Sequence, residues 1–356
     1  MSNQRSTTMT ALMKVARGAG NVELREVAVP AIAADDVLVR VAYVGVCGSD
    51  LHIHRDTHPN HPPVILGHEF SGVIEEVGDA VSGWRVGDRV VSELHGGACK
   101  ACRLCKTGNF FACPHKRPIG WWTNGAYADF IRVPAWLLHR VPDDLPLLHA
   151  ALTEPLAVCM NVFQRVPVQP RSHVVVVGPG PIGFLAGLAA KAVGAGSVTM
   201  VGRDTSRDRL ERALELGFDH VINTSHDDLQ ASVLALTEGM GADLVVEAGG
   251  SEQAVQASIV AARKLGSIAA LGVHSGYFQF PWNDAVFKAL DMTFSFSANY
   301  LAFEQALGLL RSGAVPAHRL IDGVYPLGEW REAFERLERR EALKLVLKVG
   351  ACEDDA

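Results

Sequence analysis

The chain has 356 residues, of which 48% are hydrophobic and 20% charged, and its formal net charge is −6. Single hydrophobic cores stop growing at about 250–300 residues, so a chain of this length is expected to form two. The acidic balance and the lack of a basic tract argue against nucleic acid as a partner. No apolar stretch approaches the ~20 residues that span a bilayer, so no membrane association is expected either.

The two ends of the chain are predicted to be frayed extensions. Residues Met1 to Thr10 are polar and lack the apolar segment of a signal peptide, and Cys352 to Ala356 are mostly acidic. The seven cysteines suit a reducing cytoplasm, where closely spaced thiols bind metal rather than form disulfides. A cytoplasmic location is therefore expected. Cys159 lies outside any cluster, as does Cys352, and both are interpreted as structural or incidental.

Residues 11 to about 150 are predicted to be rich in β-strands. The apolar or alternating segments are Val22–Val29, Asp36–Val46, Gly72–Val77 and the turn and strand of Gly83–Val91. Clusters of Gly, Pro and Asp separate them, as is usual between strands. This pattern favours a barrel-like β domain.

Four cysteines within this part of the chain have the spacing of a structural zinc site. They are Cys99, Cys102, Cys105 and Cys113. Thiolates at such intervals on a loop rich in Gly and Lys can converge on one tetrahedral Zn²⁺ and close its coordination shell. A closed shell has no place for substrate, so this metal would hold the loop and take no part in chemistry. The alternatives are four free thiols or two disulfides.

The pattern changes from about residue 173, where short apolar strands alternate with helical segments. The predicted strands are Val174–Val177, Ser197–Val201, Leu244–Ala248 and Ser267–Leu271. This alternation predicts right-handed βαβ units and a parallel sheet. A helix at Phe303–Arg311, an amphipathic segment at Trp330–Glu341 and a last strand at Leu343–Val349 follow. We expect a nucleotide domain inserted into the first domain, to which the chain then returns.

A glycine-rich turn follows the first of these strands. After four valines the sequence continues Gly178-Pro-Gly180-Pro181-Ile182-Gly183, and then a helix is predicted to Val193. The first glycine permits the tight turn, the second lets the backbone approach a pyrophosphate, and the third lets helix and strand pack closely. Pro181 suits the first helical turn, where an N–H is not needed. The context favours dinucleotide binding over a loop that merely turns the chain.

The choice between NAD and NADP depends on where the second strand ends. A carboxylate about 20 residues beyond the glycines normally binds the adenine ribose of NAD. If the strand ends before Gly202, that position has no carboxylate, and Arg203 with Arg207 or Arg209 can meet the 2′-phosphate of NADP. If the strand continues, Asp204 restores a preference for NAD. The sequence slightly favours NADP.

Further ligand-type residues indicate a second, open metal site. Cys47 lies in one short motif, His68 and Glu69 follow Gly67, and Glu154 precedes Pro155. Together they offer one Cys, one His and a choice of two carboxylates. A catalytic zinc needs three such ligands and a free position.

These motifs together resemble the zinc-containing medium-chain alcohol and polyol dehydrogenases, over nearly everything from Ala11 to Val349. The run that begins at Glu154-Pro155 resembles the sorbitol dehydrogenase branch. The resemblance implies an α/β protein with a GroES-like β-barrel catalytic domain and a Rossmann domain with a doubly wound parallel sheet. It places the catalytic domain at residues 11–155 and 299–350, a structural-zinc lobe at about 93–116, and the nucleotide-binding domain at 156–298.

The resemblance also implies roles for individual residues. Cys47 and His68 are expected to bind the catalytic zinc, with Glu69 and Glu154 as exchangeable carboxylates, so that each chain holds two zinc ions. Ser49 and His52 match positions that pass the hydroxyl proton to solvent, which suits a hydroxyl and an imidazole. Asp50 is expected to orient His68, and Lys344 to pair with Glu69.

Several neighbouring residues carry weaker signals. His54, His58 and His61 lie in a segment rich in Pro and Asn and are interpreted as solvated. Trp121 and Trp122 either border the substrate cleft, as the matching stretch does in relatives, or are ordinary packing residues. Phe296-Ser297 stands where sorbitol-type enzymes carry Phe-Arg, which weakens the case for sorbitol itself.

The sequence therefore predicts a zinc-dependent oxidoreductase that transfers hydride between a secondary alcohol (a polyol, sugar or related small alcohol) and NAD(P), giving the ketone. One alternative is a metal-independent quinone or enoyl reductase of related fold. Another is a non-catalytic nucleotide-binding protein. The expected partners are a small alcohol or ketone substrate and further copies of the chain, as a homodimer or homotetramer. The region Leu265–Ser297 is a candidate interface.

Overall fold

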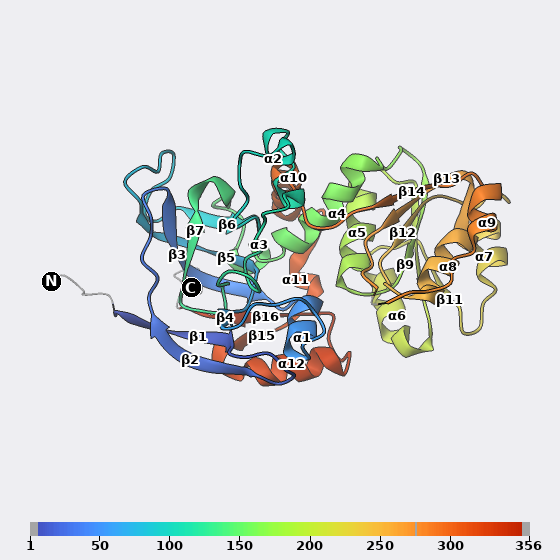
Figure 1. The fold of residues 1–356 in the computed structure, drawn as a ribbon. Helices are drawn as coiled ribbons and strands as arrows, with labels where there is room; N and C mark the ends of the chain where they lie inside the picture. The colour runs from blue at the N-terminus through green and yellow to red at the C-terminus, as the bar shows by residue number, and fades with distance from the viewer. Residues whose placement is uncertain (1–5, 275, 351–356) are drawn as a thin grey trace. The chain divides into compact units, whose positions relative to one another are not determined.

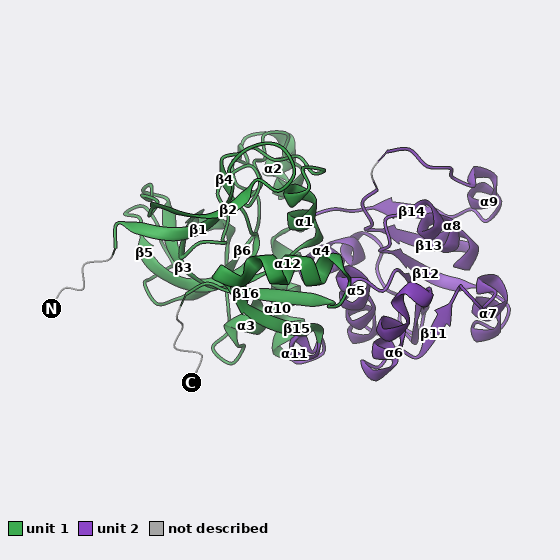
Figure 2. Cartoon of the chain, turned by 90° about the horizontal axis from the view of Figure 1, so that it is seen from below, with its two compact units in different colours: residues 1–154, 298–311, 320–356 green, residues 155–297, 312–319 purple. Residues whose placement is uncertain are grey.

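The computed structural model describes residues 6–274 and 276–350, and these form two compact units (Figure 1 and Figure 2). Unit 1 comprises residues 1–154, 298–311 and 320–356, and unit 2 comprises residues 155–297 and 312–319. The chain thus leaves unit 1, builds most of unit 2 and returns. Met1 to Arg5 and the predicted C-terminal extension Cys352–Ala356 lie outside the described residues.

Unit 1 is built on two β-sheets. The larger has the strand order β15-β16-β3-β5-β6-β8, with β7 also paired to β3, and the smaller has the order β2-β1-β4. The strands are β1 (Thr8–Lys14), β2 (Val22–Ala28), β3 (Asp36–Gly45), β4 (Val64–Ile65), β5 (Glu69–Val77), β6 (Arg89–Ser92), β7 (Phe130–Pro134), β8 (Leu138–Arg140), β15 (Ile321–Pro326) and β16 (Lys344–Lys348).

Strand β3 is the centre of this unit because nearly all of its residues are buried. Its valines pack with Tyr127, Ile131 and the apolar face of α12 in one continuous core. The helices of unit 1 are α1 (Gly48–His54), α2 (Arg103–Lys106), α3 (Leu147–Ala150), α10 (Tyr300–Arg311) and α12 (Trp330–Glu338), and α4 (Thr153–Arg165) begins here and continues into unit 2.

The prediction that the chain frays as far as Thr10 was wrong. Strand β1 begins at Thr8 and pairs with β2 in antiparallel register. This pairing buries Met9 and Ala11 against Ile65 and Ala128. Alternate apolar residues facing a second layer are what stabilise a strand, and that layer comes from distant parts of the chain.

Unit 2 contains a parallel sheet with the order β11-β10-β9-β12-β13-β14. Counted from β9, this is the order of doubly wound dinucleotide-binding folds, so the predicted fold class is confirmed. The strands are β9 (His173–Val177), β10 (Ser197–Gly202), β11 (His220–Asn223), β12 (Ala242–Glu247), β13 (Ala262–Ala270) and β14 (Asp291–Phe294). The helices are α5 (Pro181–Ala192), α6 (Arg207–Glu215), α7 (Leu229–Leu236), α8 (Glu252–Ala261), α9 (Trp282–Phe287) and α11 (Ala317–Leu320).

The sheet order reverses beside β9, and ligands of such sheets bind outside the carboxyl ends of the strands at that point. The glycine-rich turn leads from β9 into α5 at this edge. Close packing there requires Gly183, because a Cβ would lie 2.0 Å from the carbonyl oxygen of Gly178. In the part of the chain that the structure describes, no helix is both long and apolar enough to cross a membrane.

Candidate metal and cofactor sites

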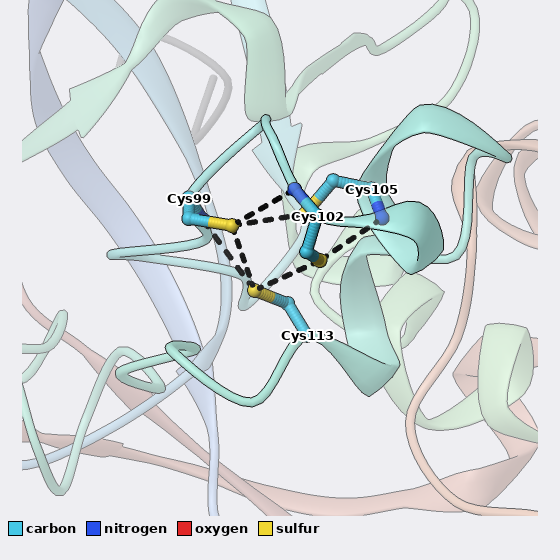
Figure 3. Close-up of side chains that lie close together, drawn as sticks. All are labelled: Cys99, Cys102, Cys105 and Cys113. Carbon is cyan, nitrogen blue, oxygen red and sulfur yellow. Dashed lines mark hydrogen bonds between the residues drawn. The ribbon is translucent and has the colours of Figure 1, made fainter.

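The four clustered cysteines converge in the loop around α2 (Figure 3). Their Sγ atoms lie 3.7 Å apart between Cys99 and Cys113, 3.9 Å between Cys102 and Cys113, and 4.0 Å between Cys99 and Cys105. Zn–S bonds of 2.3 Å in a tetrahedron place sulfur atoms about 3.8 Å apart. A disulfide needs about 2.05 Å, so these cysteines are not paired.

Backbone amides support negative charge on this cluster. The amides of Cys102, Cys105 and Cys99 donate to the sulfur atoms of Cys99, Cys102 and Cys113, at 3.3, 3.5 and 3.4 Å respectively. Hydrogen bonds from the amides of Ala101 and Cys102 lower the pKa of the Cys99 thiol to about 6. A thiolate is the form that binds zinc, so the donor set fits a closed structural Zn²⁺ site.

The candidate catalytic residues meet at the ends of β3 and β5. Antiparallel pairing sets Gly45, the last residue of β3, opposite Glu69, the first residue of β5. Cys47 follows β3 and precedes α1, and His68 precedes β5. A Cβ at Gly45 would lie 2.3 Å from the Glu69 Oε2 atom, so this position needs glycine for the carboxylate to fit.

One ligand atom each from Cys47, His68 and Glu69 lies within 4.8 Å of the others. The imidazole and carboxylate are buried and the thiol is partly exposed. A thiol, an imidazole and a carboxylate are the ligand types of catalytic zinc sites, which keep one position open. The arrangement therefore fits an open Zn²⁺ site.

Asp50 lies beneath His68, but it does not hydrogen-bond to it. The Asp50 Oδ1 and His68 Nδ1 atoms are 3.6 Å apart, and neither has a hydrogen-bond partner among the described residues. Burial alone would lower the pKa of His68, but the charge of Asp50 raises it well above its usual value. The negative charge of Asp50 would likewise favour a cation bound at His68.

Lys344 on β16 makes the predicted ion pair with Glu69. Its Nζ atom contacts Glu69 Oε2 and donates to the carbonyl oxygen of Val46 at 3.0 Å. Both charged side chains are nearly inaccessible, at 4% and 2% of their surface. Burial lowers the pKa of Lys344 but the Glu69 charge raises it further, so the lysine keeps its charge.

Glu154 lies in the first turn of α4 and stands apart from the group of three. Burial raises the pKa of Glu154 to about 7. The charge of His68 lowers this pKa, whereas the negative charge of Glu69 raises it. The two carboxylates thus interact electrostatically, but only Glu69 converges with Cys47 and His68.

Ser49 and His52 lie on α1 and are not bonded to each other. The Ser49 hydroxyl is buried and has no hydrogen-bond partner within residues 6–274 and 276–350. His52 is exposed, and its Nδ1 atom lies 3.1 Å from the hydroxyl of Thr57. A buried hydroxyl without a partner close to the candidate metal ligands is free to bond a ligand.

Some of the neighbouring histidines pack against aromatic rings. The solvated interpretation of His54 was wrong, because its ring packs edge-on against Trp330 and Phe334 at 6.0 Å. His61 is exposed, as predicted, and its ring centroid lies 3.5 Å from that of the exposed Trp122, with the two rings tilted by 39°.

Trp121 contacts the candidate metal site directly. Its ring meets His68 edge-on, with ring centroids 5.0 Å apart, and meets His58 in the same way at 5.5 Å. Trp121 therefore lies next to the candidate metal ligand His68. Phe296 is 57% exposed, and the Ser297 carbonyl oxygen accepts a hydrogen bond from Asn161 at 3.2 Å.

The glycine-rich turn of unit 2 leaves room for a ligand next to its backbone. A Cβ at Gly180 would meet nothing within 4 Å, whereas one at Gly178 would lie 2.8 Å from Gly249. Helix α5 starts at Pro181, so the free amides of its first turn face the same space. Ile182 and Gly183 complete this turn. The cradle fits the pyrophosphate of a dinucleotide.

The second strand, β10, ends at Gly202. A Cβ there would lie 2.9 Å from Ser206 Oγ, so the strand end has no room for a carboxylate. Asp204 is held by Asn223 at 2.7 Å and by His226 at 2.9 Å. Arg203 is exposed, which leaves its guanidinium available for an anion.

Arg209 supports the glycine-rich turn. It donates to the carbonyl oxygen of Pro179 at 3.3 Å. The exposed Arg207 lies 3.8 Å from Asp204.

Comparison with known proteins identifies the family. Residues 33–143 match the alcohol dehydrogenase GroES-like domain, and residues 181–312 match the zinc-binding dehydrogenase domain. The chain is 36% identical over 340 residues to a sorbitol dehydrogenase of Halalkalibacterium halodurans, covering 95% of this chain and 99% of that one. The chain belongs to the zinc-containing medium-chain alcohol dehydrogenase family.

Two further relatives of this dehydrogenase bear on its site. A D-arabitol-phosphate dehydrogenase of Enterococcus avium is 35% identical over 346 residues, covering 96% of this chain and 98% of that one. A zinc-binding dehydrogenase of Sinorhizobium meliloti, solved bound to NADP, has a TM-score of 0.88 and 28% identity, covering 96% of this chain and 100% of that one. This dehydrogenase is an oxidoreductase whose cofactors are zinc and NAD(P).

Sequence reasoning did not find one residue of the site, Tyr127. Its hydroxyl donates to Asp50 Oδ2 at 2.9 Å, and the Cys47 amide donates to the same oxygen at 2.9 Å. Burial and the neighbouring Asp50 charge raise the pKa of Tyr127 well above its usual value, so it remains a donor. No local pattern marks this tyrosine, because its partner lies 77 residues away.

Proposed function

We propose that this dehydrogenase oxidises the secondary hydroxyl of a polyol, a sugar or a related small alcohol to a ketone, reversibly, with NAD(P)⁺ as hydride acceptor. The convergence of Cys47, His68 and Glu69 is the observation that carries the proposal. Polyol chemistry is supported by the names of two relatives, a sorbitol and an arabitol-phosphate dehydrogenase. In this proposal unit 1 is the catalytic domain and unit 2 the nucleotide-binding domain.

Each residue has a proposed task. Cys47, His68 and Glu69 hold the catalytic Zn²⁺, and Glu154 stands by as the second carboxylate. A bound Zn²⁺ supplies Lewis acidity that favours ionisation of an alcohol, as it lowers the pKa of bound water to about 7. The Ser49 hydroxyl relays the proton released from the substrate hydroxyl, accepting it while it gives up its own, and the exposed His52 on the same helix accepts the relayed proton and passes it to solvent.

The charges around the site support this assignment. Lys344 pairs with Glu69 and also donates to the Val46 carbonyl oxygen, so the carboxylate is held in place in its ionised form. The buried Asp50 adds a further negative charge beside His68. A thiol, an imidazole and a carboxylate in one cluster suit a divalent cation, whereas a metal-independent reductase has no use for them.

In unit 2 we propose that Gly178, Gly180, Pro181 and the following turn hold the pyrophosphate, and that NADP is preferred over NAD. The strand end at Gly202 has no carboxylate for the ribose, and Asp204 is already held by two neighbours. The exposed Arg203 is the proposed partner of a 2′-phosphate, which a planar guanidinium binds well.

We further propose that the dehydrogenase is a cytoplasmic homodimer formed through β14. This strand is the last of its sheet, so one of its edges has no partner strand in the described part of the chain. Phe294 in the strand and Phe287 and Trp282 beside it are 68%, 77% and 69% exposed. A second copy pairing β14 with β14 about a two-fold axis would cover both the edge and these rings. Sedimentation of the wild type and of Phe294→Lys tests this, and a monomeric wild type would contradict it.

The enzymatic proposal is tested by initial rates with a panel of secondary alcohols and both oxidised cofactors, alongside zinc content. We expect two zinc ions per chain and turnover of at least one polyol. Cys47→Ser should remove one zinc and abolish turnover without unfolding the protein. A zinc-free wild type that reduces quinones or enoyl compounds would instead support the metal-independent alternative. Dinucleotide binding without any turnover would support a nucleotide-binding role.

A further inference from the structure

Glu247 is a buried acid at the cofactor edge of unit 2 that no motif in the sequence singles out. It is the last residue of β12, the strand that lies beside β9 in the sheet (Figure 1). The residue is only 1% exposed. No ion pair of Glu247 occurs among residues 6–274 and 276–350. Burying a carboxylate is costly unless hydrogen bonds replace its water, so its bonds show what it is for.

Glu247 ties two loops to the end of its strand. Its Oε1 atom accepts hydrogen bonds from the amides of Gly249 at 2.9 Å and Gly250 at 2.7 Å. Its backbone carbonyl oxygen accepts from the amides of Leu271 at 2.8 Å and Gly272 at 3.0 Å. The carboxylate therefore holds the loop after β12, whereas the loop after β13 is held by the backbone carbonyl, which any residue at this position would supply.

The two loops touch each other and the glycine-rich turn through backbone atoms. A Cβ at Gly178 would lie 2.8 Å from Gly249, and one at Gly272 would lie 2.4 Å from the Gly250 amide. A Cβ at Gly250 would lie 2.7 Å from the carbonyl oxygen of Val273. The backbones are packed so closely that a shift of the loop at residues 249–250 would displace both the glycine-rich turn and the loop at residues 271–273.

The position of these loops in the sheet gives them a function. A doubly wound sheet receives one nucleotide on each half, outside the carboxyl ends of the strands. The glycine-rich turn and Gly202 belong to the half formed by β9, β10 and β11. The loops that Glu247 holds follow β12 and β13 in the other half, so they line the place of the second nucleotide, which carries the nicotinamide.

We propose that Glu247 is a positioning residue whose carboxylate fixes the loop at residues 248–250, and through it the adjoining loop at residues 271–273, as the wall of the nicotinamide subsite. The proposal rests on the dinucleotide binding proposed above. Glu247 acts through the Gly249 and Gly250 amides, which cannot hold their place without an acceptor of this length. Asp243 offers a matched control on the same strand. It also accepts a backbone amide, that of His173 at 2.8 Å, but at the opposite, amino end of the sheet.

The test compares Glu247→Ala, Glu247→Asp, Glu247→Gln and the control Asp243→Asn. Dissociation constants for NADPH and NADH are measured by fluorescence titration, that for ADP by calorimetry, and thermal unfolding is followed in parallel. We expect Glu247→Ala to bind both reduced dinucleotides about tenfold more weakly, with ADP binding within twofold of the wild type. Glu247→Asp, one methylene too short to reach both amides, should behave alike.

Glu247→Gln supplies the rescue, because its amide oxygen can accept both hydrogen bonds. Its dissociation constants should stay within about threefold of the wild type. Asp243→Asn should unfold at a lower temperature yet bind NADPH, NADH and ADP as the wild type does. These two variants separate a positioning effect from a general loss of stability, and Glu247→Asp keeps the test decisive if Glu247→Ala does not fold.

Unchanged binding of NADPH and NADH by Glu247→Ala or Glu247→Asp would overturn the positioning role. Equal weakening of ADP and the reduced dinucleotides would do the same, because it would mean that the whole cradle had collapsed. A wild type that binds neither dinucleotide would overturn the proposed function as well as this inference.

Discussion

The strongest prediction concerns the cysteine lobe, which we expect to unfold locally when one of its four thiolates is removed. The lobe runs from Cys99 to Cys113 and has almost no apolar core. Its cluster contains three buried side chains, two of them cysteines, with four more partly buried, among them Phe110 and Trp136. Cys102→Ser removes a ligand that also caps α2, since its sulfur accepts from the Cys105 amide.

The magnitude follows from the size of the lobe. Ordering these fifteen residues costs about 20 kcal/mol at ~1.5 kcal/mol per residue. The few side chains of the cluster return about 10 kcal/mol through burial. A structural Zn²⁺ contributes about 10–16 kcal/mol, which closes the difference. Without the metal, the lobe is therefore expected to be unfolded at equilibrium while the rest of unit 1 keeps its own core.

Zinc content, amide hydrogen exchange and limited trypsin digestion measure this outcome. Cys102→Ser should bind one zinc per chain, exchange its lobe amides rapidly and be cleaved at Lys100, Arg103 or Lys106. Cys47→Ser should also bind one zinc and lose activity, but its lobe should stay protected. The reasoning is refuted if Cys102→Ser keeps two zinc ions and a protected lobe, or if both variants lose lobe protection equally.

Three further predictions address other charges. Lys344→Met should lower the unfolding free energy of the zinc-free protein by about 3–5 kcal/mol in urea, because it leaves Glu69 buried and unpaired; the exposed Lys264→Met is the control and should change it by less than about 0.5 kcal/mol. Arg203→Ala should weaken NADPH about tenfold and leave NADH unchanged, whereas equal effects would contradict a 2′-phosphate contact. Burial opposes ionisation of Asp243, but its hydrogen bonds lower its pKa. The difference in melting temperature between the wild type and Asp243→Asn should therefore be largest above about pH 5 and decrease below about pH 4. A difference that does not change with pH would contradict this.

Local patterns in the sequence were enough to predict the glycine-rich turn of unit 2 and the convergence of the four cysteines. The turn from Gly178 to Gly183 is short. Gly183 is constrained by the Gly178 carbonyl oxygen and Gly178 by Gly249, whereas Gly180 has open space beside it. The four cysteines lie on one loop, so their spacing alone predicts convergence. The parallel sheet followed from the alternation of strands and helices, whose order the structure confirms.

Long-range contacts were less accessible from local sequence patterns. Asp50 lies 3.6 Å from His68, and the residue that bonds it, Tyr127, lies 77 positions away in the sequence. The missed start of β1 and the packing of His54 against α12 have the same origin. In each case the partner surface is assembled only when distant segments pair, so propensity and periodicity within a short window carry no signal for it. The Lys344–Glu69 pair was anticipated only because the positions match those of a known family.

The two acidic residues of β12 show that the role of a residue depends on its position in the sheet. Asp243 and Glu247 are four residues apart, both are carboxylates, and both accept backbone amides from neighbouring segments. The sequence offers no reason to rank one above the other. In a parallel sheet, however, the amino and carboxyl ends of the strands have different roles, since ligands bind only at the carboxyl end. The same bond to a backbone amide therefore stabilises the fold at Asp243 and shapes a ligand wall at Glu247, and only the cofactor measurements separate the two.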